Sequence, residues 1–386
     1  MEYFKKEGGP MKTLTYLDNE KFISKLKEVG IKDVILEPRE LARMGRLKKE
    51  DLISLAKKSL SEGLRPLLQW DILMTEDGFK KAVAFFKALP KDLFYAVRVQ
   101  DPGAVEYIRT HFPDLNIHLI LETGHHNWIS IKEWIDYLGP CLKRIVLSLE
   151  LSQNVLKDYL NKIPCETELL GIGRILLFYT PRNLLSPNFE MPEEFFEVKG
   201  KSEETPHKDF PIVENRHGTF MYHPKGHDLL SQKEQLSEMG LDFLRLDFRT
   251  EDQEKIVESI DLSNLSSIKE LYSQKFINGF WKANKSDVLF KKLKNHRIQR
   301  KDENYLGEVV EVVKKKHVAI LLKNPKLSVF LKNDIEFRTP EGKVKDLNLS
   351  SLKNALLEEI PEGKSGQVVF VPHVGSLSVR TAVYKK

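Results

Sequence analysis

The sequence predicts an α/β protein with a TIM-like (β/α) barrel followed by a small C-terminal β-barrel domain. Two observations predict the larger barrel. From Asp33 onward, short apolar or β-branched runs alternate with longer amphipathic runs, and about seven such units precede residue 260. The strand-like runs are apolar along most of their length, as in a parallel sheet that is covered on both faces. An open doubly wound sheet is the alternative.

The units of the barrel can be placed along the chain. We expect strands in the runs DVILEP, RPLLQWDIL, FYAVRVQ, IHLILETG, RIVLSLEL, ELLGIGRILLFY and FLRLDFR. We expect helices between them in KEDLISLAKKSLSEG, DGFKKAVAFFKAL, GAVEYIRTHF, ISIKEWIDYLG and QNVLKDYLNKI. In the first of these helices the apolar residues recur at helical spacing, and Gly63 supplies a C-terminal stop.

The C-terminal part has a different pattern. Near Asn295 the chain becomes polar and charged in NHRIQRKDEN, which is typical of a linker. The runs GEVVEVVKKKHVAILLK, LSVFLKNDIEFRTPEGK and SGQVVFVPHVGSLSVRTAVY that follow are short, alternating and broken by turn signals. We therefore expect a barrel domain over residues 11–295 and a small β-barrel domain over residues 304–386.

One segment interrupts the alternation of strands and helices. Residues 185–226 are Pro-rich and charged and have no clear period, so an irregular insertion is expected there. Long excursions after barrel strands are commonly lids or binding loops.

Composition limits the class of protein. The 61 Lys and Arg exceed the 56 Asp and Glu only slightly, so a nucleic-acid partner is permitted but not required. Residues 1–14 contain no apolar core of a secretory signal, and no apolar run approaches the length that crosses a bilayer. Only two cysteines, Cys141 and Cys165, occur. These features predict a cytoplasmic protein without a membrane partner or a disulfide framework.

Polar residues at the carboxyl ends of barrel strands meet at one mouth and are active-site candidates. The candidates in this sequence are Glu37, Gln69, Asp71, Arg98, Gln100, Asp101, Glu122, Glu150, Glu168, Arg245, Asp247 and Arg249. We assign catalytic roles to Glu150, Glu168 and Asp247 and substrate binding to Gln100, Arg245 and Arg249. A buried charge needs a partner or a task, so structural ion pairs across the barrel are the alternative for each.

The run ELLGIGRILLFYTPRNLLSP adds three more candidates for substrate binding. Tyr179, Arg182 and Asn183 form a polar cluster just after the expected strand. Arg182 could hold a carboxylate or phosphate through its fork of donors. The GxG in this run lacks the further residues of a phosphate loop. The alternative is a tight exit from a strand with a surface arginine.

Histidines are the remaining chemical candidates. His125, in ETGHHNW, could act as acid, base or ligand and is assigned to substrate binding. His223 and His227 have the spacing His-x-x-x-His, which aligns two metal ligands only in a helix, and Pro224 and Gly226 argue against one. We therefore predict no metal site. We expect solvated loop histidines, and a metal site at His223 and His227 is the alternative.

The chain resembles the collagenase-like peptidase family U-32 (peptidase U32). In that family a strand with a glutamate, a glycine-containing turn and a Tyr-Ser-x-Arg-Cys-like run precede an Asp-Leu segment and a Lys-Ile-Glu-Gly-Arg-like strand. The resemblance extends through VQDPG at 99–103 and LKNDIEFRTPEG in the small domain. The matching residues here are Glu150, Glu168, Gly173, Tyr179, Arg182, Asp228, Leu229, Asp247 and Arg249.

The resemblance implies hydroxylation of RNA or of ubiquinone precursors, with four cysteines that bind a four-iron, four-sulfur cluster. This chain departs from the family at that point. Leu176 and Asn183 stand where the first two cysteines would fall, and the following loop contains none. Because thiolate ligation needs several sulfur donors, a cysteine-ligated cluster is not expected, and no other cofactor is predicted.

Three functions follow from these features. The first is a protein related to the RNA-modifying (tRNA hydroxylation) branch, which binds an anionic or RNA substrate at the barrel mouth. In this hypothesis the run LFKKLKNHRIQRK binds phosphates, and a solvated helix end is the alternative for that run. The second is a non-catalytic paralogue that binds RNA or a protein partner such as a cluster-bearing relative. The third is a true peptidase, for which we find neither HExxH nor GxSxG.

Overall fold

The computed structural model describes residues 9–187, 195–201, 208–282, 301–339 and 343–386. The chain divides into two compact units, Met1–Leu289 and Phe290–Lys386, and each has a hydrophobic core of its own. No helix among the described residues has the length and apolar character needed to cross a membrane.

The first unit is built on a closed barrel of parallel strands. The ring closes because β13 pairs in parallel with both β1 and β7. The strands are β1 (Lys12–Tyr16), β2 (Asp33–Leu36), β3 (Arg65–Trp70), β4 (Ala96–Val99), β5 (Ile117–Ile120), β6 (Leu142–Val146), β7 (Glu166–Gly173) and β13 (Phe243–Leu246). This arrangement confirms the TIM-like barrel and excludes the open sheet.

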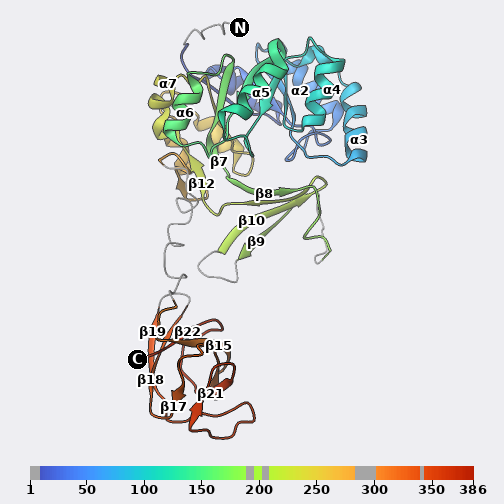
Figure 1. The fold of residues 1–386 in the computed structure, drawn as a ribbon. Coiled ribbons are helices and arrows are strands. Elements are labelled where there is room, and N and C mark those ends of the chain that lie inside the picture. Colours follow the sequence, from blue (N-terminus) through green and yellow to red (C-terminus); the bar gives the residue numbers. More distant parts are fainter. Residues whose placement is uncertain (1–8, 188–194, 202–207, 283–300, 340–342) are drawn as a thin grey trace. The chain divides into compact units, whose positions relative to one another are not determined.

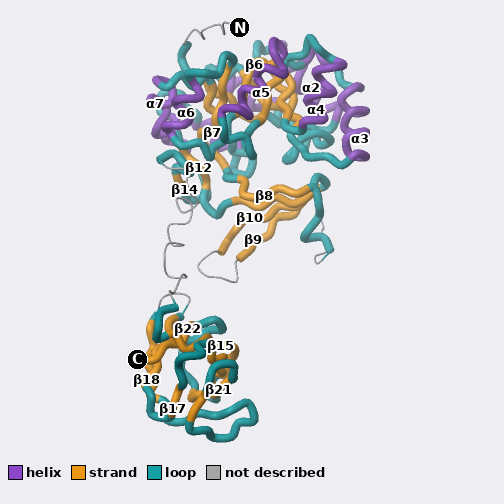
Figure 2. Tube along the Cα trace, viewed as in Figure 1, coloured by secondary structure: helices purple, strands orange, loops and turns teal. Residues whose placement is uncertain are grey.

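Helices surround the barrel strands (Figure 2). They are α1 (Ile23–Glu28), α2 (Lys49–Ser61), α3 (Glu76–Lys87), α4 (Pro102–His111), α5 (Trp128–Leu138), α6 (Gln153–Leu160), α7 (Lys233–Glu238) and α8 (Gln253–Ser259). The starts of α3, α4, α5 and α8 are fixed by side chains that accept a backbone N–H, those of Thr75, Asp101, Asn127 and Asp252. Their apolar stripes pack on the outside of the strands in one large hydrophobic core.

Strand β1 lies before the point where the sequence pattern was expected to begin. Its run KTLTY is short and half polar, yet all but Lys12 is buried. The buried hydroxyl of Thr15 donates to the carbonyl of Leu246 at 2.9 Å, so this polar group has a hydrogen-bond partner. Because the run contains polar residues, a search for apolar runs does not detect the strand.

The prediction of an irregular insertion at 185–226 is wrong in its secondary structure. Three strands from this part of the chain, β9, β10 and β11, join the preceding β8 in a four-stranded antiparallel sheet (Figure 1) with the order β8-β11-β10-β9. Register shifts in β10 and β11 and a proline within β10 disturb the period of two, so the strands are hard to see in the sequence. The strands are β8 (Leu176–Thr180), β9 (Phe195–Lys201), β10 (Lys208–Asn215) and β11 (Gly218–Tyr222).

The run ELLGIGRILLFY is two strands in two different sheets rather than one. Strand β7 ends at Gly173, and β8 starts at Leu176 in the antiparallel sheet. Gly173 has φ of 156°, and a Cβ atom there would lie 2.9 Å from Cβ of Asp247. The chain therefore leaves the barrel at a position that only glycine fits closely. Two short strands, β12 (Gly226–Asp228) and β14 (Phe276–Ile277), extend the barrel sheet beyond β7.

The second unit is rich in antiparallel strands, as predicted. Six strands form a sheet in the order β19-β18-β22-β15-β16-β21, and β17 (Val329–Phe330) pairs with β20 (Glu362–Gly363). Its hydrophobic core is separate from that of the barrel and includes Val309, Ile335 and Phe337. The six strands are β15 (Tyr305–Val313), β16 (His317–Leu322), β18 (Asp334–Arg338), β19 (Val344–Asn348), β21 (Val368–Pro372) and β22 (Ala382–Lys385).

Candidate functional site at the barrel mouth

The barrel interior holds a buried network of charges whose centre is Glu168 on β7. The two oxygens of Glu168 accept from Arg98 on β4 at 2.6 and 2.8 Å. Arg245 on β13 donates to the same carboxylate at 3.2 Å, and Arg144 on β6 at 3.5 Å. Burial alone would raise the pKa of Glu168, but the nearby arginines outweigh it and lower the pKa to about 2. Glu168 is therefore ionised at neutral pH.

The network continues toward the end of the barrel where the strands begin. Arg144 donates to Asp33 and to Glu166, each at 2.8 Å. Asp33 is also paired with Arg65 at 2.6 Å. The bottom of the barrel is thus filled by ion pairs in addition to the apolar side chains that occupy this layer in most such barrels.

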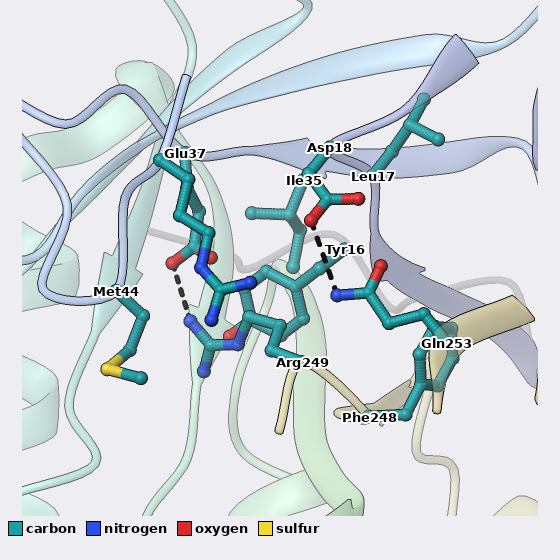
Figure 3. Close-up of a pocket in the computed structure, with 10 residues that line it drawn as sticks. Tyr16, Leu17, Asp18, Ile35, Glu37, Met44, Phe248, Arg249 and Gln253 are labelled. Carbon is teal, nitrogen blue, oxygen red and sulfur yellow. Dashed lines mark hydrogen bonds and ion pairs between the residues drawn. The ribbon is translucent and has the colours of Figure 1, made fainter. Parts of the chain in front are cut away.

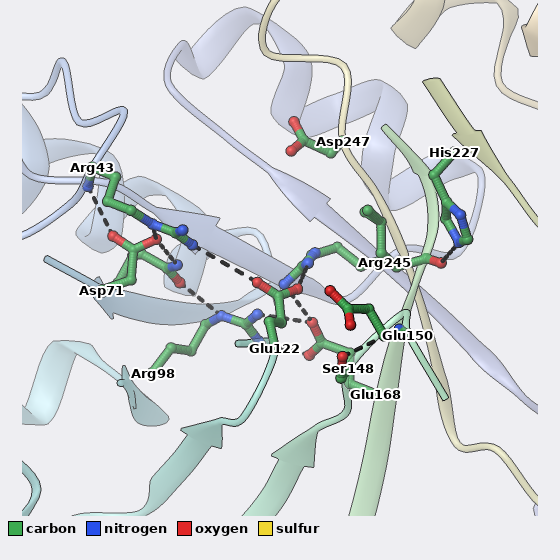
Figure 4. Close-up of polar contacts among 12 residues, drawn as sticks. Arg43, Asp71, Arg98, Glu122, Ser148, Glu150, Glu168, His227, Arg245 and Asp247 are labelled. Carbon is green, nitrogen blue, oxygen red and sulfur yellow. Dashed lines mark hydrogen bonds and ion pairs between the residues drawn. The ribbon is translucent and has the colours of Figure 1, made fainter. Parts of the chain in front are cut away.

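The network also reaches the mouth, where the strands end (Figure 4). Nε of Arg98 donates to Gln69 at 2.8 Å, and Gln69 donates to Asp71 at 2.9 Å. Asp71 accepts from both the backbone N–H and Nε of Arg43, each at 2.8 Å. Glu122 pairs with Arg245 and lies 3.7 Å from Arg43. Each of these arginines therefore already has a carboxylate partner.

A second cluster at the mouth joins β1, β2 and the end of β13 (Figure 3). Arg249 is held by Asp247 at 2.6 and 2.9 Å and by Glu37 at 2.5 Å. Its guanidinium carbon lies 3.7 Å from the centre of the Tyr16 ring, close enough for a cation–π contact. Burial raises the pKa of Glu37 to about 7, although Arg249 opposes the shift. Glu37 can therefore exchange a proton near neutral pH.

A cavity of about 70 Å³ opens among these groups. Its lining includes Tyr16, Glu122, Glu150, Tyr222, Arg245 and Asp247. The lining of the cavity therefore contains two aromatic rings together with arginines that already have carboxylate partners. Because the arginines in this lining already have carboxylate partners, a free anion would have to compete with those carboxylates.

Comparison with known proteins identifies the family. Residues 29–308 match the sequence profile of peptidase family U32. The chain belongs to peptidase family U32. The resemblance stated from the sequence motifs is thus confirmed.

Curated relatives of this U32 chain carry the name tRNA hydroxylation protein. Protein P of Escherichia coli K12 is 23% identical over 354 residues, which cover 75% of this chain and 76% of the relative. Protein P of Haemophilus influenzae is 22% identical over 318 residues, covering 64% and 68%. Protein P2 of Bacillus subtilis is 22% identical over 211 residues, covering 53% and 67%.

Solved structures of U32 proteins are also similar to parts of this chain. The C-terminal domain of the putative U32 peptidase from Geobacillus thermoleovorans is 15% identical, with 24% of this chain and 97% of that one covered and a TM-score of 0.20. The U32 peptidase Mk0906 is 14% identical, with 44% and 72% covered and a TM-score of 0.35.

The three residues assigned to catalysis lie in different surroundings in this U32 barrel. Glu168 is fully buried in its ion pairs, which is the structural alternative that the sequence left open. Asp247 is occupied by Arg249. The side chain of Glu150 is 45% exposed and lies 3.9 Å from Nε2 of His126. Glu150 is therefore the most accessible of the three, and its role, like theirs, remains a prediction.

The residues assigned to substrate binding are divided between the mouth and its surroundings. Arg245 and Arg249 line the cavity. Gln100 donates to Thr123 at 3.2 Å, and Nδ1 of His125 contacts the hydroxyl of Ser130 at 2.5 Å. Burial lowers the pKa of His125, which keeps its ring neutral at neutral pH. His125 lies just before α5 and is not among the residues that line the cavity.

Tyr179 lies in β8 of the antiparallel sheet and Arg182 and Asn183 follow that strand, so none of the three lies at the end of a barrel strand. The Tyr179 hydroxyl accepts the backbone N–H of Leu73 at 3.0 Å and donates to the carbonyl of His217 at 3.3 Å. It therefore fastens the sheet to the loop after β3. Arg182 and Asn183 follow β8 and are exposed, so they do not line the cavity.

His223 and His227 are buried, not solvated as expected for loop histidines. His227 lies in β12, where Nε2 contacts the carbonyl of Leu170 at 3.1 Å, and burial lowers its pKa to about 4. Nδ1 of His223 contacts the backbone of Lys225. Within the described ranges, no group of three or more His, Cys, Asp or Glu side chains could hold a metal ion.

The two cysteines do not lie at the mouth of the barrel. Cys141 precedes β6 and Cys165 precedes β7, at the end of the barrel where the strands begin. The thiol of Cys141 is 3.2 Å from the carbonyl of Pro113. Neither their number nor their place fits a four-cysteine cluster next to the cavity.

Sequence reasoning missed Tyr16 and Tyr222, and it placed Glu37 among the candidates at the mouth without giving it a catalytic or binding role. Glu37 carried a signal, since it is a charge at the end of an apolar strand. Tyr16 lay in the strand that the pattern missed, and Tyr222 in the segment expected to be irregular. Only the closure of the barrel and the pairing of β11 bring these three side chains to the mouth.

Proposed function

We propose that this U32 chain is an RNA-modification protein related to the tRNA hydroxylation proteins, and that part of its RNA substrate binds at the barrel mouth. The observation that carries the proposal is the match to protein P of Escherichia coli over 75% of this chain and 76% of the relative. A cytoplasmic location, where tRNA is found, follows from the same proposal.

A nucleobase or ribose, rather than a phosphate, is the part of RNA that suits the cavity. Arg245 and Arg249 are engaged by Glu122, Glu168, Glu37 and Asp247, so a phosphate would have to compete with carboxylates that are already in place. The half-buried ring of Tyr222 lines the cavity, and proteins commonly stack unpaired RNA bases on aromatic side chains, whereas the ring of Tyr16 is buried against Arg249. Of the anionic and RNA ligands expected from the sequence, a base is therefore the one that we propose.

Glu37 and Glu150 are the carboxyl groups best suited to proton transfer. Glu37 has a pKa of about 7 because it is buried, and it touches Arg249, which lines the cavity. Glu150 lines the cavity and is half-exposed. Glu168, with its pKa of about 2, holds the arginines in place instead. We assign it a positioning role in this proposal.

Any redox chemistry in this proposal requires a group from outside the chain. The two cysteines cannot supply four thiolates, so the residues of this chain do not fit a cysteine-ligated iron-sulfur cluster. A cluster-bearing relative of the same family is the partner that we propose for a redox step.

The test is the nucleoside content of tRNA in a strain that lacks the gene. We expect a modified nucleoside to disappear and to return with the wild-type chain. Complementation with Glu37→Gln should restore it poorly, while Glu254→Gln, at an exposed glutamate that does not line the cavity, should restore it fully. An unchanged nucleoside profile by mass spectrometry in the deletion strain would contradict the proposal.

A non-catalytic paralogue is the second candidate, and the completeness of the ion pairs favours it. The arginines of the mouth need no ligand for charge balance, so the site is stable when empty. Complementation of the deletion strain separates the two. Full restoration of the modified nucleoside by both Glu37→Gln and Glu150→Gln would favour the paralogue, because a non-catalytic chain does not need proton transfer at the cavity.

A true peptidase receives little support from the geometry. Ser148 and His126 form a contact of 3.0 Å at the end of β6, but Ser148 is only 1% exposed and its hydroxyl accepts the N–H of Glu150. Proteolysis of casein or gelatin that is lost in Ser148→Ala would support this function. Proteolysis that survives this change and also Glu168→Gln and Arg182→Ala would come from a contaminant.

A further inference from the structure

Charge is distributed unevenly between the two units of the chain. Residues 290–386 contain 20 Lys and Arg against 11 Asp and Glu, a net charge of +9. Residues 1–289 contain 41 Lys and Arg against 45 Asp and Glu, a net charge of −4. Five of the cations of the second unit fall in 290–300, outside the described residues. The slight positive charge of the whole chain therefore conceals a basic C-terminal unit.

The described part of this unit presents its cations at the tip of one hairpin. Lys314, Lys315 and Lys316 connect β15 to β16 and are all exposed. The turn is closed by a hydrogen bond from the N–H of Lys316 to the carbonyl of Val313 at 3.0 Å. None of the three ammonium groups forms an ion pair with a described residue. We call these three residues the basic tip.

Among the residues that the structure describes, no carboxylate pairs with the basic tip. The nearest glutamate on β15, Glu311, is 3.2 Å from His317 at the start of β16. A further exposed cation, Arg380, donates its backbone N–H to Val309 of the same hairpin strand at 2.8 Å. Strand β21 pairs with β16 next to the tip through Pro372 and His317, so the hairpin is held on a sheet. The tip is thus a positioned group of cations.

We propose that the basic tip, Lys314 to Lys316, binds the phosphate backbone of the RNA. This inference rests on the proposed function. The arginines of the mouth are engaged by internal carboxylates, whereas the tip lysines have no such partner among the described residues. Lysines bind phosphates as point charges without reading sequence, and each contact releases counterions, so the binding weakens steeply with salt.

The test is the salt dependence of binding to an unmodified tRNA transcript, measured by fluorescence anisotropy with the full chain. In the triple variant Lys314→Gln, Lys315→Gln and Lys316→Gln, we expect the slope of log K against log salt to fall in magnitude by about 3, near 1 per lysine. The dissociation constant at low salt should rise at least about 10-fold. Thermal unfolding should be unchanged, because the three side chains are exposed.

A matched control removes three exposed lysines from the barrel helices. The variant Lys57→Gln, Lys58→Gln and Lys81→Gln changes the net charge equally but lies on α2 and α3. Its dissociation constant should stay within about 2-fold of the wild type. Equal losses in both triple variants, or none in the tip variant, would overturn the proposal.

The outcome also distinguishes a failure of the basic tip from a failure of the proposed function. If the wild-type chain binds no tRNA transcript, both fail. If binding depends on the tip while the deletion strain keeps its full set of modified nucleosides, the RNA contact stands and the modification function fails.

Discussion

Arg98 and Glu168 lie 70 residues apart in the sequence and face each other in the barrel interior through two hydrogen bonds of 2.6 and 2.8 Å. Both side chains are fully buried. Two more arginines share the same carboxylate, so removal of Glu168 would leave three guanidinium groups short of a partner in the buried interior. The pair therefore fixes the barrel interior beneath the candidate site.

The substitution Arg98→Met should destabilise the protein strongly. The change removes the two shortest hydrogen bonds to the buried Glu168 and leaves only the longer contacts with Arg144 and Arg245, and breaking a buried ion pair costs about 3–5 kcal/mol. We expect this loss in the free energy of unfolding by urea. The exposed pair Lys162–Asp158 supplies the control, since Lys162→Met should cost less than about 1 kcal/mol. Similar losses in the free energy of unfolding for the two variants would show that Arg98 does not stabilise the barrel interior more than an exposed ion pair does.

Stability should depend on pH through Glu37. Its pKa is about 7 in the folded protein and near 4.5 when unfolded, so the folded state binds the extra proton between these values. The contribution of Glu37 is therefore full below about pH 4.5 and is lost as pH rises through 7. The loss in the free energy of unfolding that is due to Glu37 is on the order of 3 kcal/mol at most, because one unit of pKa shift corresponds to about 1.36 kcal/mol.

The variant Glu37→Gln isolates this effect. Glutamine cannot titrate, so the fall in unfolding free energy between pH 5 and pH 8 should be smaller in the variant than in the wild type. Urea unfolding at the two pH values measures both. If the difference between pH 5 and pH 8 is the same in both proteins, Glu37 is not the titrating group.

The hydroxyl of Tyr179 should hold the antiparallel sheet against the barrel. Removal of this hydroxyl in Tyr179→Phe leaves the N–H of Leu73 without its acceptor, at a cost of about 1–3 kcal/mol. Hydrogen exchange at Leu73 and in β8 and β11 should become faster. Tyr137→Phe, at an exposed tyrosine on α5, is the control and should leave these amides unchanged. Equal protection in Tyr179→Phe and the wild type would show that the sheet is held by other contacts.

Gly173 should tolerate no side chain. In Gly173→Ala the new Cβ atom would lie 2.9 Å from Cβ of Asp247, at a backbone φ of 156°. Asp247, which holds Arg249, would therefore have to shift. We expect a loss of about 1–3 kcal/mol in thermal unfolding experiments. Gly78→Ala is the matched control. Its nearest neighbour would be 3.4 Å away, in the first turn of α3, so stability should be unchanged or higher.

The sequence determined the class of architecture and the family. Alternating apolar and amphipathic runs are a local property, since a parallel strand and the helix after it each carry their own pattern. The motifs around Glu150, Glu168 and Asp247 were enough to indicate the U32 family, and the profile match confirms it. The presence of only two cysteines was equally visible.

The tertiary structure alone decided which of the polar residues meet and what they can do. Glu168 and Glu37 look alike in the sequence, yet one has a pKa of about 2 and the other about 7. The reason is the number of arginines that each meets in a buried place, and those arginines come from strands far apart in the chain. The sheet from β8 to β11 is also set by pairings between distant strands, because register shifts and a proline erase its local period. Long-range pairing of charges and strands has no periodic signature, and for that reason only the folded chain reveals it.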